Sequence, residues 1–189
     1  MSFNSDGSIL LGKDIFLFKN FISEKQALDL FNLAISMDDS FWDNRTYHYT
    51  SNTHIKEIEP VIKKLSEKFF GDIVLDDACY FQKYHMGGNM GQHQDDNKVL
   101  DQIELSKTYK EGTPYKIINQ PRYGIVIYLN KVSGGELFYS KQNILYEPYP
   151  GDLVIHSAEE HCTHGVNPLK SDVRICIPTY AYSKIKVPL

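Results

Sequence analysis

The spacing of hydrophobic and polar positions changes character near residue 71. Before it, apolar residues recur at helical spacing over residues 24–37, behind Ser23, which is a typical N-cap. A second helical pattern covers residues 54–70, and Pro60 predicts that the helix proper begins near that residue. A compact apolar run at residues 15–18 precedes both patterns. The first third of the chain is therefore predicted to be helical after one short strand.

After Gly71, short runs rich in Val, Ile, Tyr and Phe predict strands at residues 73–84, 123–130, 137–139, 144–146, 153–156 and 173–182. Closely spaced short strands that follow helices are typical of a jelly roll. We therefore expect an α+β, mainly β fold, a double-stranded β-helix (jelly roll) with N-terminal helices packed on one sheet. No repeat or linker divides the sequence. A single domain over 1–189 is expected, with a helical part over about 1–72 and a jelly-roll core over about 73–182.

Composition narrows the classes of protein that this fold could serve. The 189 residues are 42% hydrophobic, enough for one core, and the net charge of −4 argues against a general nucleic-acid coat. No run approaches the roughly 20 apolar residues that span a bilayer, and no basic segment precedes an apolar one at the N-terminus. Three scattered cysteines do not form a disulfide framework. We therefore expect a cytoplasmic protein without a membrane partner.

The segment from 84 to 96 contains the first candidate metal ligands. His93 and Asp95 are two residues apart, so on a strand both side chains project from the same face. An HxD pair alone is common by chance. Further along the chain lie His161 and His164, and either could supply a third ligand from another strand. Two histidines and one carboxylate form the facial set that suits non-haem Fe(II) and leaves positions open.

Several further motifs accompany this pair in a fixed order. The sequence contains Tyr84, Gly87-Gly88, His93 and Asp95, Tyr128-Leu129-Asn130, Gly134-Gly135-Glu136, Pro150-Gly151-Asp152, the HGVNP segment at 164–168, and Arg174. In this order they resemble the Fe(II)- and 2-oxoglutarate-dependent oxygenases, most closely the prolyl 4-hydroxylase-like branch. The resemblance extends over about residues 73–182, more than half of the chain.

The resemblance implies a role for each site residue. His93, Asp95 and His164 would hold Fe(II). His164 is chosen over His161 because the family has a basic residue about ten positions after its distal histidine. Counting from His164 reaches Arg174, whereas counting from His161 reaches a serine. Arg174 would then bind the distal carboxylate of 2-oxoglutarate through two parallel hydrogen bonds.

Two tyrosines and the carboxylate complete the implied site. Tyr84 and Tyr128 stand where relatives often place hydroxyl groups against 2-oxoglutarate, although tyrosines on strands are more often plain core residues. Related halogenases replace the carboxylate ligand by a small residue. The presence of Asp95 therefore predicts hydroxylation.

The expected enzyme is a dioxygenase (an oxidoreductase) that consumes O2 and 2-oxoglutarate, with ascorbate as a candidate reductant, and releases succinate and CO2. A prolyl residue in a peptide or protein is the first substrate expected. The alternative is the same chemistry on a free amino acid, a small metabolite or a nucleic-acid base. A base is disfavoured by the negative net charge and by the lack of a second arginine after Arg174. A non-catalytic jelly-roll binding module is the third hypothesis.

Two polar segments are candidates for covering the site. Residues 97–120 show little periodicity and predict a long loop, and residues 39–52 contain Trp42, Arg45, Tyr47 and Tyr49. The latter mixture suits a peptide- or base-binding groove, but it also suits a cap on a β-sandwich. His156 lies near a strand end shortly before His164 and is a candidate for lining the pocket, but a structural role is expected.

Overall fold

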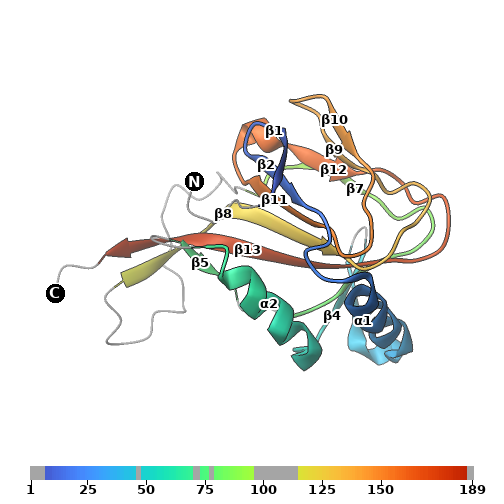
Figure 1. Ribbon diagram of the computed structural model, residues 1–189. Helices are drawn as coiled ribbons and strands as arrows, with labels where there is room; N and C mark the ends of the chain where they lie inside the picture. Colours follow the sequence, from blue (N-terminus) through green and yellow to red (C-terminus); the bar gives the residue numbers. More distant parts are fainter. Residues whose placement is uncertain (1–6, 46–47, 70–72, 77–78, 96–114, 187–189) are drawn as a thin grey trace.

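Two antiparallel sheets form the frame of the protein (Figure 1). The computed structural model describes residues 7–45, 48–69, 73–76, 79–95 and 115–186. Over these residues the larger sheet has the strand order β1 (Ile9–Gly12), β2 (Ile15–Phe18), β11 (Leu153–Ser157), β8 (Tyr115–Tyr128), β13 (Arg174–Lys186), β6 (Gln82–Tyr84), β4 (Tyr49–Ser51) and β3 (Trp42–Asn44), with β5 (Ile73–Leu75) paired to β13. The smaller sheet has the order β10 (Ile144–Tyr146), β9 (Leu137–Tyr139), β12 (His164–Val166) and β7 (Met90–His93).

The helices pack on the face of the larger sheet that points away from the smaller one (Figure 1). They are α1 (Glu24–Ser36) and α2 (Glu59–Ser66), and short 3-10 turns lie at η1 (Asp39–Phe41), η2 (Lys56–Ile58) and η3 (Glu160–Cys162). A capping box starts α1, in which Ser23 and Gln26 satisfy each other's backbone N–H groups. The predicted fold class, a jelly roll with N-terminal helices on one sheet, is confirmed.

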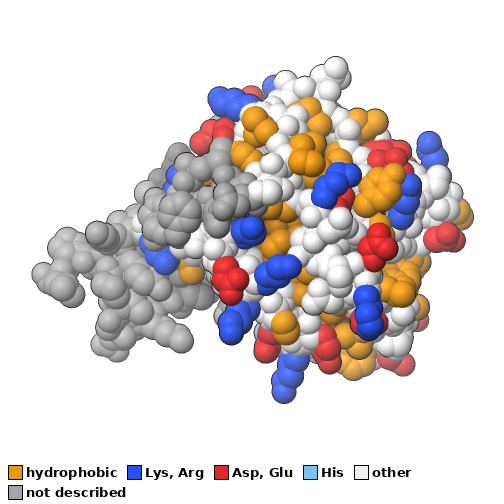
Figure 2. Space-filling model, in the orientation of Figure 1, with side chains coloured by type: hydrophobic (Ala, Val, Ile, Leu, Met, Phe, Trp, Pro, Cys, Tyr) orange, Lys and Arg blue, Asp and Glu red, His pale blue; other side chains and the backbone are white. Residues whose placement is uncertain are grey.

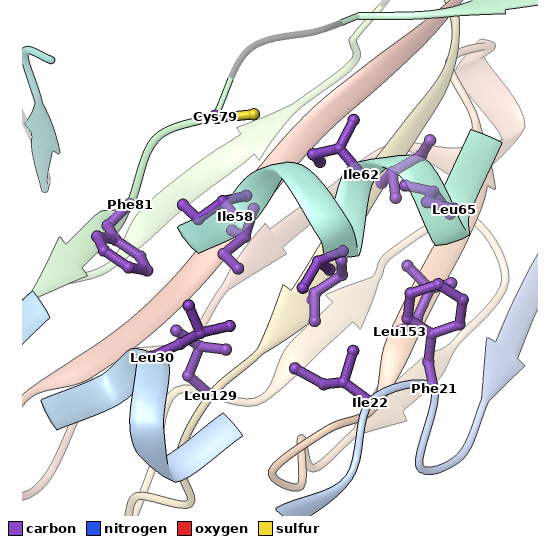
Figure 3. Close-up of a cluster of buried hydrophobic side chains, with 14 of the residues drawn as sticks. Phe21, Ile22, Leu30, Ile58, Ile62, Leu65, Cys79, Phe81, Leu129 and Leu153 are labelled. Carbon is purple, nitrogen blue, oxygen red and sulfur yellow. The ribbon is translucent and has the colours of Figure 1, made fainter. Parts of the chain in front are cut away.

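The hydrophobic core is divided between the two faces of the larger sheet. On the helix side, Leu30 of α1 and Ile62 and Leu65 of α2 are buried together with Phe21, which lies in the segment between β2 and α1 (Figure 3). A second cluster, which includes Tyr128 and Tyr139, fills the space between the sheets. Each fully buried side chain of this size contributes roughly 1.5–3 kcal/mol. The layers are thereby fixed, and the space between the sheets has a defined lining.

Strand alternation decides which residues reach that space. On β13, Ile175 and Ile177 pack toward the helices, whereas Arg174 and Cys176 lie on the opposite face. On β8, Ile127 packs toward the helices, whereas Tyr128 points into the space between the sheets. A strand exposes alternate residues to opposite faces. One strand therefore supplies both core and site.

The structure corrects several boundaries predicted from the sequence. The prediction of a loop over 97–120 is wrong for residues 115–120, which belong to β8 and pair with the end of β13; its remainder falls in 96–114, outside the described residues. The predicted strand 73–84 is divided into β5 and β6, and the predicted helix 54–70 comprises η2 and α2. Strands β1, β3 and β4 were not predicted. The strand at 115–120 has a physical reason, because a partner strand can stabilise a polar segment through backbone hydrogen bonds that hydrophobic spacing does not report.

Charged side chains are dispersed over the surface in Figure 2, with both signs interspersed on the face shown. Among the described residues, none of the helices combines the length and apolar character needed to span a membrane.

Candidate active site

Three of the predicted site residues converge at the edge of the smaller sheet. His164 on β12 is the register partner of His93 on the neighbouring strand β7, and Asp95 follows two residues after β7 ends. One ligand atom from each of the three residues lies within 4.8 Å of the other two. The side chain of Asp95 is only 6% exposed, whereas that of His93 is 33% exposed. The two predicted histidine ligands and the carboxylate are thus brought together.

Backbone carbonyls fix the orientation of both imidazoles. His93 Nδ1 lies 2.9 Å from the carbonyl oxygen of Gly91, and His164 Nδ1 lies 3.0 Å from that of Cys162. A carbonyl only accepts, so in each ring Nδ1 carries the proton and donates it. In a neutral ring of this tautomer the Nε2 atom keeps its lone pair, which is the form that binds a metal ion.

Burial and charge set the protonation states of this group. Burial raises the pKa of Asp95, but the hydrogen bond from His156 and the neighbouring histidines outweigh it, and the pKa falls to about 2. Burial, with a further contribution from His156, lowers the pKa of His164 to about 3. At neutral pH the site therefore presents an ionised carboxylate and a neutral His164 imidazole.

Arg174 lies on β13 with its side chain between the sheets, and it is 1% exposed. Its Nη1 donates a hydrogen bond to the carbonyl of Gly135, and its guanidinium carbon lies 4.5 Å from the ring centroid of Tyr84 and 5.7 Å from that of Tyr128. Its Nε is buried with no hydrogen-bond partner among the described residues. A buried guanidinium that is only partly satisfied favours an anionic ligand.

Two of the sequence motifs hold this arginine in place. The side chain of Asn130 donates to the carbonyl of Val173 at 2.8 Å and accepts from the backbone N–H of Ile175 at 2.9 Å. It therefore fixes the backbone on both sides of Arg174. Gly135 has a φ of 69°, and an added Cβ would lie 3.0 Å from Arg174 Nη1. The Tyr-Leu-Asn and Gly-Gly-Glu motifs thus act as positioning elements.

The two predicted tyrosines stay protonated. Burial raises the pKa of Tyr84 and of Tyr128 well above their ordinary range, and the charge of Arg174 opposes this only in part. The hydroxyl of Tyr84 donates to Gln82 Oε1 at 3.1 Å. Both tyrosines therefore offer neutral hydroxyl groups beside the guanidinium.

One pocket joins the histidine–carboxylate group to the arginine. Its lining contains all six predicted site residues, with apolar walls, and it includes Tyr84, His93, Asp95, Tyr128, Leu137, His164, Val166, Arg174, Cys176 and Pro178. A cationic end and a metal-ligating end in one pocket fit a small dicarboxylate that chelates a divalent cation. The donor set also fits Fe(II), because it offers two imidazoles and one carboxylate.

The other candidates from the sequence have different surroundings. His161 does not join the group, since its Nε2 contacts Asp14 Oδ2 at 3.0 Å. Within the segment 39–52, Trp42 is buried and lies beneath Lys83, whose Nζ is 3.9 Å from the ring centroid. Trp42 thus belongs to the hydrophobic core on the helix side of the larger sheet. His48 from the same segment does approach the pocket, with its ring centroid 5.4 Å from that of Tyr84.

Sequence reasoning gave His156 a structural role and did not identify Tyr139 or Gly124 as residues of this site. His156 on β11 contacts Asp95, Tyr139 on β9 contacts His156, and Gly124 on β8 provides the space between them. His156 interrupts a buried apolar run, Leu153–Ser157, and a polar residue inside such a run is the signal that could have indicated a buried partner.

Neither a family model nor a curated protein sequence matches the chain. Solved structures do match it. A viral collagen prolyl hydroxylase from Paramecium Bursaria Chlorella virus-1, in a 2-oxoglutarate complex, aligns with a TM-score of 0.65 and 15% identity over 91% of this chain and 97% of that chain. A Trichoplax adhaerens prolyl hydroxylase bound to a hypoxia inducible factor peptide fragment aligns with a TM-score of 0.58 and 14% identity, covering 90% and 84%.

A third match has a different kind of ligand. HygX from Streptomyces hygroscopicus, solved with nickel, 2-oxoglutarate and hygromycin B, aligns with a TM-score of 0.57 and 9% identity over 90% of this chain and 82% of that chain. The protein therefore has the double-stranded β-helix fold of the 2-oxoglutarate/Fe(II) oxygenases. The resemblance inferred from its motifs is confirmed at the level of the fold.

Proposed function

We propose that the protein is an Fe(II)- and 2-oxoglutarate-dependent dioxygenase, a single domain over 1–189, that hydroxylates a substrate C–H bond and releases succinate and CO2. The observation that carries this proposal is Arg174, a buried guanidinium with an unpaired Nε in the same pocket as His93, Asp95 and His164. 2-Oxoglutarate matches both ends of that pocket, because one end of the molecule is a carboxylate and the other is a chelating keto acid.

Each residue has a defined task in this proposal. His93 and His164 present neutral Nε2 atoms, and Asp95 supplies negative charge, so together they would hold Fe(II) on one side only. The iron, when bound, supplies the redox chemistry with O2. Arg174 would orient 2-oxoglutarate by its distal carboxylate, and Tyr84 and Tyr128 would donate hydroxyl hydrogen bonds to it. The apolar walls keep bulk water away from the reacting end.

A prolyl residue in a peptide or protein is the substrate class that we propose first. Two of the structural matches are prolyl hydroxylases, and one of them holds a peptide fragment. In this chain a hollow of about 330 Å³ lies outside the pocket and is lined by Arg45, His48, Tyr49, His85 and Met86, among others. It offers room for residues that flank a reacting prolyl group. A small metabolite is the second candidate, supported by the match to a protein solved with hygromycin B.

The test of the reaction class is an anaerobic visible spectrum of the metal-free protein with Fe(II), before and after addition of 2-oxoglutarate. Wild type is compared with His164→Ala and Arg174→Met. We expect a weak charge-transfer band that requires both 2-oxoglutarate and His164 and that weakens in Arg174→Met. Wild type that leaves the iron unbound would overturn the proposal and favour a binding module.

The test of the substrate class is succinate release with a library of proline-containing peptides and with free amino acids, in the presence of ascorbate. Mass spectrometry then measures a gain of one oxygen in each candidate. Hydroxylation of a peptidyl proline supports the first candidate. Succinate release that is stimulated only by small molecules supports the second.

A further inference from the structure

His156 lies in the middle of the site, although neither the facial set nor the sequence motifs include it. It belongs to β11 and is 1% exposed. Its Nε2 lies 2.9 Å from Asp95 Oδ2, and its Nδ1 lies 2.7 Å from the hydroxyl oxygen of Tyr139. Its ring centroid is 4.1 Å from that of His164. Three buried side chains therefore form a chain of hydrogen bonds that ends on one oxygen of the carboxylate.

The direction of these hydrogen bonds follows from the chemistry of the groups. An ionised carboxylate only accepts, so His156 Nε2 must carry the proton and donate it to Asp95. In a neutral ring the other nitrogen, Nδ1, is then an acceptor, and the hydroxyl of Tyr139 donates to it. Both nitrogens of His156 and the hydroxyl of Tyr139 are hydrogen-bonded in this arrangement, and it fixes one tautomer of His156.

The two oxygens of Asp95 consequently differ. Oδ2 accepts a hydrogen bond from His156, while Oδ1 lies 3.7 Å from His93 Nε2. We propose that His156 is a positioning residue that holds Asp95 Oδ2 away from the metal ion, so that Asp95 binds it through Oδ1 alone. This inference rests on the proposed function. A carboxylate bound through one oxygen leaves one more coordination position open than a bidentate carboxylate does.

The backbone of β8 leaves room for the contact between His156 and Asp95. Gly124 on β8 is the register partner of His156 on β11. A Cβ added to Gly124 would overlap both Asp95 Oδ2 and His156 Nε2. The absence of a side chain at this one position is what allows the carboxylate to reach the imidazole. Tyr139 is held in turn on β9, as the register partner of His164.

The test measures metal affinity, with Mn(II) as the probe and the electron paramagnetic resonance signal of free Mn(II) as the readout. His156→Phe preserves the ring but removes the donor, and His156→Gln returns an N–H donor near the position of Nε2. His161→Phe is the matched control, since His161 bonds Asp14 instead. Residues that orient a metal ligand typically contribute 10–100-fold in affinity. We expect His156→Phe to weaken Mn(II) binding by that factor, and His156→Gln and His161→Phe to remain within about threefold of wild type.

The outcomes separate the inference from the proposed function. Binding by His156→Phe equal to that by wild type, or equal weakening in His156→Phe and His156→Gln, would overturn the role of His156 while leaving the metal site intact. Wild type that does not bind Mn(II), or that binds it independently of His93 and His164, would overturn the proposed function itself. If His156→Phe does not fold by circular dichroism, Tyr139→Phe replaces it. Loss of the hydroxyl donor is expected to weaken binding severalfold, and unchanged affinity would count against the inference.

Discussion

Replacing Arg174 with methionine separates the effect of the buried guanidinium on the free energy of unfolding from its effect on 2-oxoglutarate binding. Methionine keeps an unbranched apolar stem of similar length between Tyr84 and Tyr128 but removes the charge. Burying a charged group costs on the order of several kcal/mol even after the protein relaxes, so removal of the guanidinium recovers free energy. The carbonyl of Gly135 loses its donor, which costs about 1–3 kcal/mol. Without 2-oxoglutarate, we therefore expect the variant to be about as stable as wild type.

The same substitution should greatly weaken 2-oxoglutarate binding. Truncating one partner of a buried, hydrogen-bonded charge pair costs about 2–5 kcal/mol, which corresponds to a loss of affinity of roughly 30- to 5,000-fold. Ligand binding also stabilises the folded state, by about 2.7 kcal/mol at 100 times the dissociation constant. At a 2-oxoglutarate concentration that gives wild type this stabilisation, Arg174→Met should gain almost none.

Urea denaturation of the Mn(II)-loaded protein, with and without 2-oxoglutarate, measures both effects in one experiment. Succinate is the control ligand, because it has two carboxylates but no keto group for chelation. The reasoning is refuted if Arg174→Met is several kcal/mol less stable than wild type without ligand and is still stabilised equally by 2-oxoglutarate. That result would make Arg174 a structural residue.

Three further predictions concern the same pocket. Gly124→Ala should displace the carboxylate of Asp95 and lower Mn(II) affinity at least tenfold in the resonance titration, with little change in the circular dichroism spectrum. Tyr84→Phe should raise the dissociation constant of 2-oxoglutarate roughly fivefold, the equivalent of one hydrogen bond of about 1 kcal/mol, as measured by titration of the anaerobic band. Because the pKa of His164 is about 3 in the folded protein against an ordinary 6.5, the unfolded chain takes up a proton first as the pH falls. Metal-free wild type should therefore lose about 2 kcal/mol of stability between pH 7 and pH 5 in urea denaturation, and His164→Gln should lose correspondingly less.

The site residues could be predicted from the sequence where their spacing along one strand, or the order of the motifs, determines their position. His93 and Asp95 are two positions apart on an extended segment, so their convergence follows from strand geometry alone. His164 lies 71 positions after His93, so its pairing with that segment required the order of motifs that the family resemblance supplied. Arg174 followed from the same order. The six predicted residues line one pocket.

The residues that support the site could not be predicted in the same way. His156 reaches Asp95 only because β11 and β8 are neighbours in the larger sheet, and because Gly124 leaves room on the facing strand. Pairing between distant strands depends on tertiary contacts that the spacing of residues within one segment does not encode. The pairing of β8 with β13 over residues 115–121 was missed for the same reason.

The charges in the pocket can be read together as a requirement for two ligands of opposite sign. The Nε2 atoms of His93 and His164 converge with the carboxylate of Asp95, and ligand atoms at such distances could together hold a cation. Arg174 at the other end is a buried cation that favours an anion. Under the proposed function, a chelating dicarboxylate would bridge the two ends and let each charge compensate the next, so cation and anion should each strengthen binding of the other. The unpaired groups of the protein thus specify the chemistry of what binds there.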